Sequence, residues 1–403
     1  MLLTQKTHSI RTPQIPSLSE GNSHMTLAAF NLPEQLAALQ AQSLKRTPRA
    51  LSHGVTPTIW RGGKEYLNFS SNDYLGLASH YALRDAVSET LNQHGVGAGA
   101  AHLITGHTDL HERLEQRLAQ VSGYPRALLF SAGYMANMGV LDALLTPKST
   151  IYQDKLNHAS LIDGARISGA THRRYPHQDL ATLERWLESD QSELKLIATD
   201  QVFSMDGTEA DLSALRSLTE KYHAALMIDD AHGFCVRAEP LPKVDVYMAT
   251  LGKAVGTFGA FVAGSDELIE FLQSRARTFC FTTATPPILA AATLAALDVI
   301  ETETWRRERL ATHVVRLRAA LLEQGWQLTE SQTAIQPIII GSAEKTLALS
   351  KQLEERGILA VAIRPPTVPV GTSRLRVTLS AAHSDEDVGR LIEVFALLSH
   401  QSY

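Results

Sequence analysis

Two apolar runs that each end in a chemically reactive side chain constrain the fold of this chain more than any other feature. Residues 225–228 lead directly into Asp229, and residues 244–249 lead into a small-residue turn that carries Lys253. Short apolar runs bounded by polar residues and glycines are typical of buried strands. In an open α/β sheet, polar residues at the carboxyl ends of such strands face the ligand crevice. The two runs therefore predict an α/β fold with one site at its strand ends.

Apolar runs of strand length alternate with helical segments over most of the chain, which favours a large domain with a mostly parallel sheet and a smaller α/β domain after it. We expect the large domain at residues 71–300, the small domain at residues 301–403, and an N-terminal segment at residues 26–70. Further strands are expected at residues 127–130, 151–154, 194–199, 259–263, 334–340, 358–363 and 374–379. Helices are expected at residues 32–44, 81–93, 135–144, 211–222, 266–277, 344–356 and 385–398, with one or two more in residues 288–323.

Residues 1–25 are expected to be a disordered leader or a tag, because they are rich in Ser, Thr and Pro and show no hydrophobic periodicity. A transit peptide is an alternative, although Pro13 and Pro16 would break the amphipathic helix that it requires. Met25 is equally suited to be the natural start after a tag junction.

The composition excludes several classes of partner. A net charge of -5 without a long basic cluster argues against a nucleic-acid surface, which needs Lys and Arg to neutralise phosphates. The longest apolar run, at residues 286–297, is too short for a membrane span and suits a buried helix. Cys235 and Cys280 are too few for a disulfide framework, which favours a reducing compartment. We therefore expect a cytoplasmic protein with small-molecule partners.

The chemistry of Lys253 depends on its surroundings. A lysine amine becomes a nucleophile toward carbonyl groups when burial or a neighbouring cation lowers its pKa, whereas most lysines beside glycine are solvated surface groups. Asp229 and His232 can face the same ligand; the alternatives are an acidic turn or a metal site that includes Asp230. A nucleophilic lysine with a nearby carboxylate suits pyridoxal 5'-phosphate (PLP), whose ring nitrogen needs an acidic partner.

Two further segments carry groups that bind anions. Residues 131–134 form a small-residue turn that opens a helix, and unpaired backbone N–H groups there can seat a phosphate at Gly133 and Tyr134; a plain strand-to-helix turn is the alternative. Arg374 and Arg376 alternate on one expected strand, so their guanidinium groups share a face and can grip a carboxylate.

Glycine and histidine patterns elsewhere are less specific. Residues 95–99 match a dinucleotide fingerprint only superficially, because a helix rather than a strand precedes them, so a flexible turn is expected. His107 and His111 have a spacing compatible with metal binding on a helix but lack a third ligand, so we expect core or capping roles and no metal.

Seven motifs follow one another in a fixed order, at residues 68–76, 131–134, 157–160, 203–207, 225–233, 250–253 and 364–369. They resemble those of the α-oxoamine synthases, PLP-dependent transferases of fold type I. The resemblance covers about residues 40–398 and implies the large PLP-binding domain and small C-terminal domain of that fold.

The resemblance also implies a role for each matching residue. Lys253 would anchor PLP and act as the catalytic base, Asp229 would pair with the ring nitrogen, and His158 would stack on the ring, although a lone histidine there is more often a surface residue. Other implied cofactor contacts are Gly133, Tyr134, Ser204, His232, Thr250 and Thr283. Implied substrate contacts are Arg46, Asn72, His158, Thr367 and Arg376, with Arg364 as a further candidate. A turn serine and a solvated arginine remain the alternatives for Ser204 and Arg46.

Residues 362–379 are most similar to the biotin-pathway members of the family, which implies decarboxylative condensation of L-alanine with a pimeloyl thioester of coenzyme A or acyl carrier protein. Thr283 would reach the cofactor phosphate of a neighbouring subunit, which implies a homodimer with shared active sites. The loop at residues 233–247 is several residues shorter than usual in the family and leaves the acyl donor open. Alternatives are members that resemble glycine C-acetyltransferase or serine palmitoyltransferase, an aminotransferase, or a noncatalytic partner subunit; the presence of Lys253, Asp229 and His158 disfavours the last.

Overall fold

The structure is a computed structural model that describes residue 27 and residues 30–41, 44–53, 57–239 and 241–399. The chain divides into two compact units, Met1–Ala50 and Leu51–Tyr403. In the first unit, α2 (Leu32–Ala41) confirms the expected helix, and all of its residues are exposed. The expected leader at residues 1–25 lies outside the described residues.

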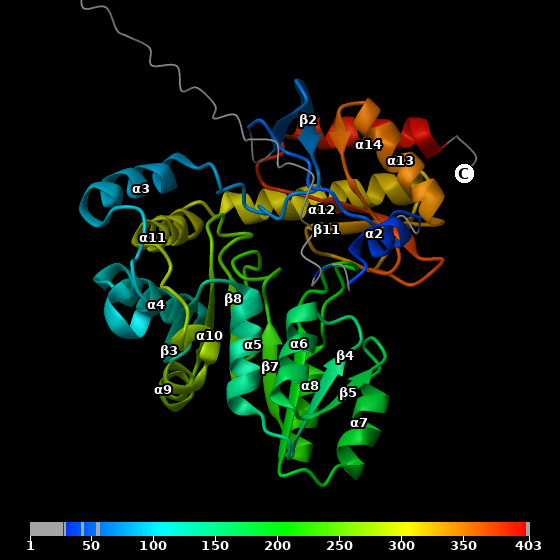
Figure 1. Cartoon of the computed structure of the whole chain (residues 1–403). Coiled ribbons are helices and arrows are strands. Elements are labelled where there is room, and N and C mark those ends of the chain that lie inside the picture. Colours follow the sequence, from blue (N-terminus) through cyan, green and yellow to red (C-terminus); the bar gives the residue numbers. More distant parts are fainter. Residues whose placement is uncertain (1–26, 28–29, 42–43, 54–56, 240, 400–403) are drawn as a thin grey trace, which may run out of the picture. The chain divides into compact units, whose positions relative to one another are not determined.

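A seven-stranded sheet forms the centre of the second unit, with the strand order β3-β9-β8-β7-β6-β4-β5 (Figure 1). Neighbours from β8 to β5 pair in parallel, whereas β9 pairs antiparallel with both β3 and β8. The expected α/β class with a mostly parallel sheet is confirmed. The strands are β3 (Arg126–Phe130), β4 (Ser149–Asp154), β5 (Thr171–Tyr175), β6 (Leu194–Asp200), β7 (Ala225–Asp229), β8 (Val246–Thr250) and β9 (Ala260–Gly264).

Side chains of this sheet alternate between two apolar cores, which explains why its central strands β7, β8 and β9 are largely apolar. Leu129 and Ile228 face one core, whereas Leu128 and Met227 face the other. The helices that contribute to the first core include α3 (Tyr81–His94), α4 (Asp109–Ser122), α7 (Leu180–Ser189), α8 (Leu212–Tyr222) and α11 (Pro287–Thr302). The second is completed by α5 (Gly133–Leu144), α6 (Ala159–Ser168), α9 (Asp266–Arg275) and α10 (Arg277–Cys280).

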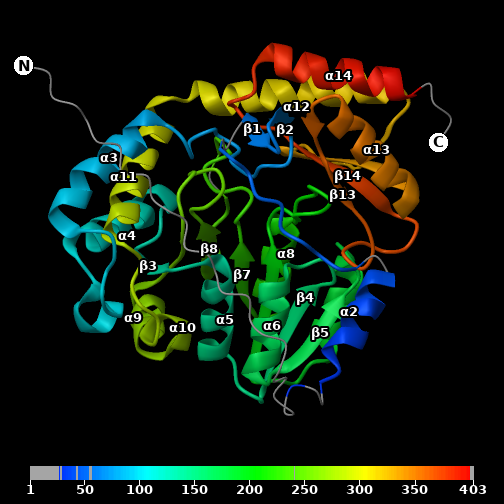
Figure 2. The same cartoon turned by 45° about the horizontal axis from the view of Figure 1, so that its top comes forward.

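Two smaller sheets lie outside the central one. The four-stranded antiparallel sheet has the order β10-β11-β14-β13, and the three-stranded sheet has the order β1-β2-β12. Their strands are β1 (Thr58–Arg61), β2 (Lys64–Asn68), β10 (Gln327–Leu328), β11 (Ile335–Gly341), β12 (Ile358–Leu359), β13 (Val361–Ile363) and β14 (Ser373–Thr378). The remaining helices are η1 (His102–Gly106), α12 (Trp305–Glu323), α13 (Ala343–Glu355) and α14 (Asp385–Ser399), of which α12 and α14 lie side by side (Figure 2).

Two expected elements are divided. Residues 358–363 do not form one strand: β12 pairs with β2, and β13 pairs with β14, so the chain changes sheets at Ala360. The helix expected at residues 266–277 ends at Arg275, and α10 begins at Arg277. The boundaries expected near residues 70 and 300 stay predictions. Among the described residues, none of the helices has the length and apolar character needed to cross a lipid bilayer.

Candidate active site

The carboxyl ends of the parallel strands bring the central site residues together. Asp200 ends β6 and lies in register with Asp229 at the end of β7, which is in register with Met248 of β8. Lys253 follows in the turn after β8. Parallel pairing aligns these strand ends at one edge of the sheet, where ligands bind in open α/β folds. This edge is the candidate active site.

Lys253 lies in a turn whose shape depends on Gly256. The φ angle of Gly256 is +73°, and a Cβ on it would lie 2.6 Å from the backbone nitrogen of Ala78, so a larger residue does not fit. The N–H of Gly256 donates to the carbonyl oxygen of Lys253 at 2.9 Å. A Cβ on Gly252 would meet only the Thr257 carbonyl oxygen at 3.6 Å, so the glycine before the lysine is not required sterically.

The environment of Lys253 suits a reactive amine. The residue is partly buried, and the loss of water lowers its pKa. The charge of Asp229 opposes this shift, and that of Arg376 adds to it. A lowered pKa increases the fraction of neutral amine, which is the form that attacks a carbonyl carbon or accepts a proton.

The Asp229 carboxylate is held by donors on both oxygens. Asp229 is buried; its Oδ2 accepts a hydrogen bond from Asn137 Nδ2 at 2.7 Å, and its Oδ1 accepts one from the N–H of Ala231 at 3.0 Å. Asn137 Nδ2 also donates to Ser160 Oγ at 2.8 Å, which lies 2.7 Å from His158 Nδ1. One amide group therefore links the carboxylate to the imidazole. The sequence reasoning missed Asn137 and Ser160, although Ser160 lies in the motif that contains His158.

His158 and Asp200 add a histidine and a second carboxyl group. The backbone N–H of His158 donates a hydrogen bond to Asp200 Oδ2 at 2.9 Å. The imidazole is exposed, yet nearby protein removes enough water to lower its pKa; Asp229 opposes this shift and Lys253 adds to it. Burial, followed by the neighbouring Asp229 charge, raises the pKa of Asp200 well above its ordinary value, so a neutral Asp200 can lie near Asp229 without charge repulsion. The sequence reasoning missed Asp200, whose signal was its position at a strand end next to that of Asp229.

The turn between β3 and α5 contains a cradle that a side chain would fill. A Cβ on Gly133 would lie 2.6 Å from Cγ2 of Thr250, so glycine is required there. Among the described residues no side chain caps this helix end, so its first backbone N–H groups remain available to an anion. The Tyr134 hydroxyl donates a hydrogen bond to Asp163. Tyr134 would therefore contact the phosphate through its backbone N–H. The cradle fits the phosphate of the expected PLP.

Arg376 of β14 lies beside two other predicted site residues. Its Nη1 and Nη2 are each 3.2 Å from Asn72 Oδ1, and its Nε donates to the carbonyl oxygen of Ser204 at 2.6 Å. Arg374, on the same face of the strand, instead forms an ion pair with Asp206. Among the described residues the hydrogen bonds of Arg376 go to neutral groups, so its charge is available to a substrate carboxylate.

His232 faces the same group of residues. Its Nδ1 lies 2.5 Å from the hydroxyl of Tyr74, which is 3.2 Å from Asn72 Oδ1. Burial lowers the pKa of His232 well below its ordinary value, and the charges of Lys253 and Arg376 lower it further. His232 is therefore a neutral imidazole near the lysine and the arginine of the site.

Three predicted contacts are not joined to this group by any described interaction. Thr283 is exposed and forms an isolated β-bridge with Ala101. Thr367 is exposed in the turn after β13, and its N–H donates to the carbonyl oxygen of Arg364 at 3.0 Å. Arg46 is exposed and belongs to the first unit. The roles expected for these residues stay predictions.

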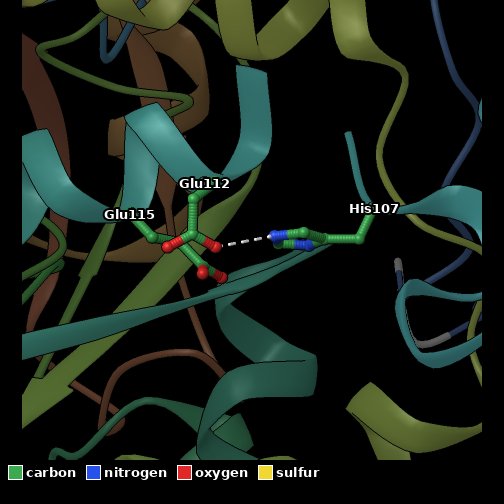
Figure 3. Close-up of side chains that lie close together, drawn as sticks. All are labelled: His107, Glu112 and Glu115. Atoms are coloured by element: carbon green, nitrogen blue, oxygen red, sulfur yellow. Dashed lines mark ion pairs between the residues drawn. The ribbon is translucent and has the colours of Figure 1, made fainter. Parts of the chain in front are cut away.

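A second group of titratable side chains lies around the start of α4. Ligand atoms of His107, Glu112 and Glu115 lie within 4.8 Å of one another, with the His107 ring directed toward the Glu112 carboxylate (Figure 3). Burial raises the pKa of Glu115 to about 8, so its carboxyl group is mainly protonated at neutral pH, and its Oε1 accepts the N–H of Leu129 at 2.9 Å. His111 takes part in a capping box at the same helix end, which confirms its expected capping role.

Known proteins share this fold and much of this sequence. Residues 64–395 match the aminotransferase class I and II family. A curated relative from Herminiimonas arsenicoxydans, named 8-amino-7-oxononanoate synthase, is 50% identical over 378 residues, which cover 90% of this chain and 97% of the relative.

Two solved structures resemble the chain over most of its length. A serine palmitoyltransferase from S. paucimobilis with bound PLP and myriocin has a TM-score of 0.85 at 25% identity and covers 92% of this chain and 97% of its own. An 8-amino-7-oxononanoate synthase from Francisella tularensis has a TM-score of 0.72 at 28% identity and covers 83% of this chain and 97% of its own. The chain therefore belongs to the aminotransferase class I and II family and, within it, to the group of the 8-amino-7-oxononanoate synthases.

Proposed function

We propose that this chain is a PLP-dependent acyltransferase of biotin biosynthesis that condenses L-alanine with a pimeloyl thioester. The products are 8-amino-7-oxononanoate, carbon dioxide and the free thiol of the acyl carrier. One observation carries the proposal: a lysine of lowered pKa and a doubly hydrogen-bonded aspartate converge at the strand ends of a chain that is 50% identical to a relative of that name.

The residues at the sheet edge fit PLP group by group. Lys253 would hold the aldehyde carbon, Asp229 would face the ring nitrogen, and the cradle of Gly133 and Thr250 would take the phosphate. When bound, PLP supplies an electron sink for negative charge that develops next to the substrate amine. The negative charge of Asp229 would favour a proton on the ring nitrogen, which strengthens that sink.

The other residues would orient the substrate and move its proton. Arg376, whose Nη1 and Nη2 contact Asn72, would attract the alanine carboxylate through its positive charge, because its partners are neutral groups. The Lys253 amine would accept the Cα proton, because its lowered pKa keeps part of it neutral. His158, whose Nδ1 is held by Ser160, would present a ring of fixed orientation to the face of the cofactor.

We also propose a homodimer in which Thr283 contributes to the site of a second copy. Near the bridge between Thr283 and Ala101, the apolar side chains of Leu103, Ile104 and Phe281 are 54%, 74% and 76% exposed. Exposed apolar groups gathered in one region mark an interaction surface. Sedimentation of the wild-type chain and of Ile104→Asp tests this proposal: a dimer that the substitution converts to monomers supports it, and a wild-type monomer refutes it.

The decisive test of the function combines cofactor mapping with turnover. Borohydride reduction after incubation with PLP should place a pyridoxyl group on Lys253, as read by peptide mass spectrometry. The wild-type protein should then convert L-alanine and pimeloyl thioester to 8-amino-7-oxononanoate. The kcat of Lys253→Ala should be lower by a factor of at least about 10³, because the catalytic base is removed. Lys148→Ala, at an exposed position, is the matched control. A tag on another lysine, or full activity in Lys253→Ala, would refute the assignment.

One competing function has a specific observation in its favour. The serine palmitoyltransferase structure has a higher TM-score, 0.85, than the 8-amino-7-oxononanoate synthase structure, 0.72. Turnover with L-alanine, glycine and L-serine, each against pimeloyl and palmitoyl thioesters, separates the two, and pimeloyl groups on coenzyme A and on acyl carrier protein identify the carrier. A cytoplasmic location is part of the proposal, and the unbridged state of Cys235 and Cys280 supports it.

A further inference from the structure

We infer that Tyr74 is a positioning residue that holds the hydrogen of His232 on Nε2 and so keeps a hydrogen-bond donor available to the cofactor site. The benefit to catalysis rests on the proposed function. The hydrogen position itself is a property of the protein and can be measured without turnover.

The contacts around Tyr74 determine where its proton goes. Tyr74 is fully buried, and its hydroxyl lies 2.5 Å from His232 Nδ1 but 3.2 Å from Asn72 Oδ1. Asn72 Oδ1 also receives two N–H groups of Arg376, each at 3.2 Å. Because a carbonyl oxygen has two lone pairs, Asn72 is already fully engaged as an acceptor. The hydroxyl therefore donates over the shorter distance, to His232.

The ionisation states agree with this direction. Burial raises the pKa of Tyr74 to about 12, with Arg376 opposing, so the hydroxyl keeps its proton. Burial lowers the pKa of His232 well below its ordinary value, and the charges of Lys253, Arg376 and His158 act in the same sense. A neutral imidazole has one acceptor nitrogen and one donor nitrogen. With Nδ1 accepting from Tyr74, the donor is Nε2.

His232 is one of the cofactor contacts that the family resemblance implies, and a hydrogen fixed on Nε2 would let it donate to bound PLP. Without the tyrosine hydroxyl, both tautomers become accessible, and the fraction with hydrogen on Nδ1 would present a lone pair at Nε2 instead of a donor. The expected cost is a roughly tenfold lower kcat with little change in the KM for L-alanine, the size expected for one positioned hydrogen bond.

The direct test is long-range ¹H–¹⁵N NMR of the full chain labelled with ¹⁵N-histidine, recorded with and without PLP. The resonance of His232 is assigned by its loss in His232→Gln. We expect a protonated-type Nε2 and an unprotonated-type Nδ1 in both samples. A hydrogen on Nδ1 in the wild-type protein overturns the inference without any tyrosine variant.

Tyr74→Phe is the matching perturbation, and Tyr152→Phe is its control. Tyr152 is also fully buried with a short hydrogen bond, from its hydroxyl to Asp190 Oδ2 at 2.5 Å. Tyr74→Phe should give a mixture of His232 tautomers and shift the visible absorbance of the PLP-loaded protein, whereas Tyr152→Phe should change neither. An unchanged tautomer in Tyr74→Phe refutes the positioning role. Absence of turnover with any acyl thioester, combined with the expected tautomer, instead refutes the proposed function alone.

Discussion

Asn137 Nδ2 donates a hydrogen bond to Asp229 Oδ2 across 2.7 Å and so joins helix α5 to strand β7 at the candidate active site. Its second hydrogen goes to Ser160, while its Oδ1 is buried without a partner among the described residues. A flipped amide would place Oδ1 against the carboxylate oxygen and lose the bond to Asp229, because a carboxylate has no hydrogen to donate. The orientation of Asn137 is therefore set by the need to hold Asp229.

Asn137→Ala should weaken PLP binding while the fold is retained. A hydrogen bond to a charged group contributes about 1.5–3 kcal/mol, so the Kd for PLP should rise roughly 10- to 100-fold. Titration of the visible absorbance of the protein with PLP measures this change. Asn92→Ala removes an amide of α3 whose Nδ2 donates to the carbonyl oxygen of Ser88 in the same helix, and it should leave the Kd unchanged. Equal Kd values for the two variants would contradict the role of Asn137.

Gly133→Ala should damage the phosphate cradle in a way that a second substitution repairs. The new Cβ would lie 2.6 Å from Cγ2 of Thr250, and such overpacking costs about 1–3 kcal/mol. Thr250→Ser removes the Cγ2 methyl but keeps the hydroxyl that donates to the Ala231 carbonyl oxygen. The double variant should therefore recover both Tm and PLP affinity relative to Gly133→Ala. Gly97→Ala, where a Cβ meets nothing within 4 Å, is the control.

Arg376→Lys and Arg374→Lys should affect different properties. Lysine cannot reproduce the fork of Arg376, so the KM for L-alanine should rise at least about tenfold. Arg374 pairs with Asp206, and its replacement should lower Tm without a comparable effect on KM. Steady-state kinetics and thermal unfolding of both variants separate these outcomes. A similar rise in KM for the two would show that Arg376 is not the specific carboxylate-binding group.

Glu115→Gln should remove a pH-dependent loss of stability. The pKa of Glu115 is raised from 4.5 to about 8, so between these values the folded state holds a proton that the unfolded state has released. Stability therefore falls as pH rises through this window, by up to about 1.4 kcal/mol per pH unit. The free energy of unfolding of Glu115→Gln relative to wild type should grow by at least about 2 kcal/mol from pH 5 to pH 9. Glu89→Gln, at an exposed carboxylate of α3, is the control; a flat difference for Glu115→Gln would contradict the shift.

The helices and strands that could be predicted from sequence are those marked by the pattern of apolar and polar residues within the segment itself. The strand before Asp229 and the strand before Lys253 are apolar and end in polar turns, and both form as expected. Strand β5 was missed because it lies at the sheet edge and carries polar residues, Thr171 to Arg174, on a half-exposed ribbon. The division of residues 358–363 was missed because a continuous β-like run contains no sign of which partner strand each half will meet.

The amino-acid sequence by itself determined the α/β class, the strand ends that carry Asp229 and Lys253, and the glycine turns around them, because apolar spacing and turn chemistry depend on neighbouring residues. Only the tertiary structure decided that Asn137 holds Asp229 and that Tyr74 meets His232. These partners come from elements far apart in the chain, and which side chains meet depends on how helices and sheets pack rather than on any pattern near either residue.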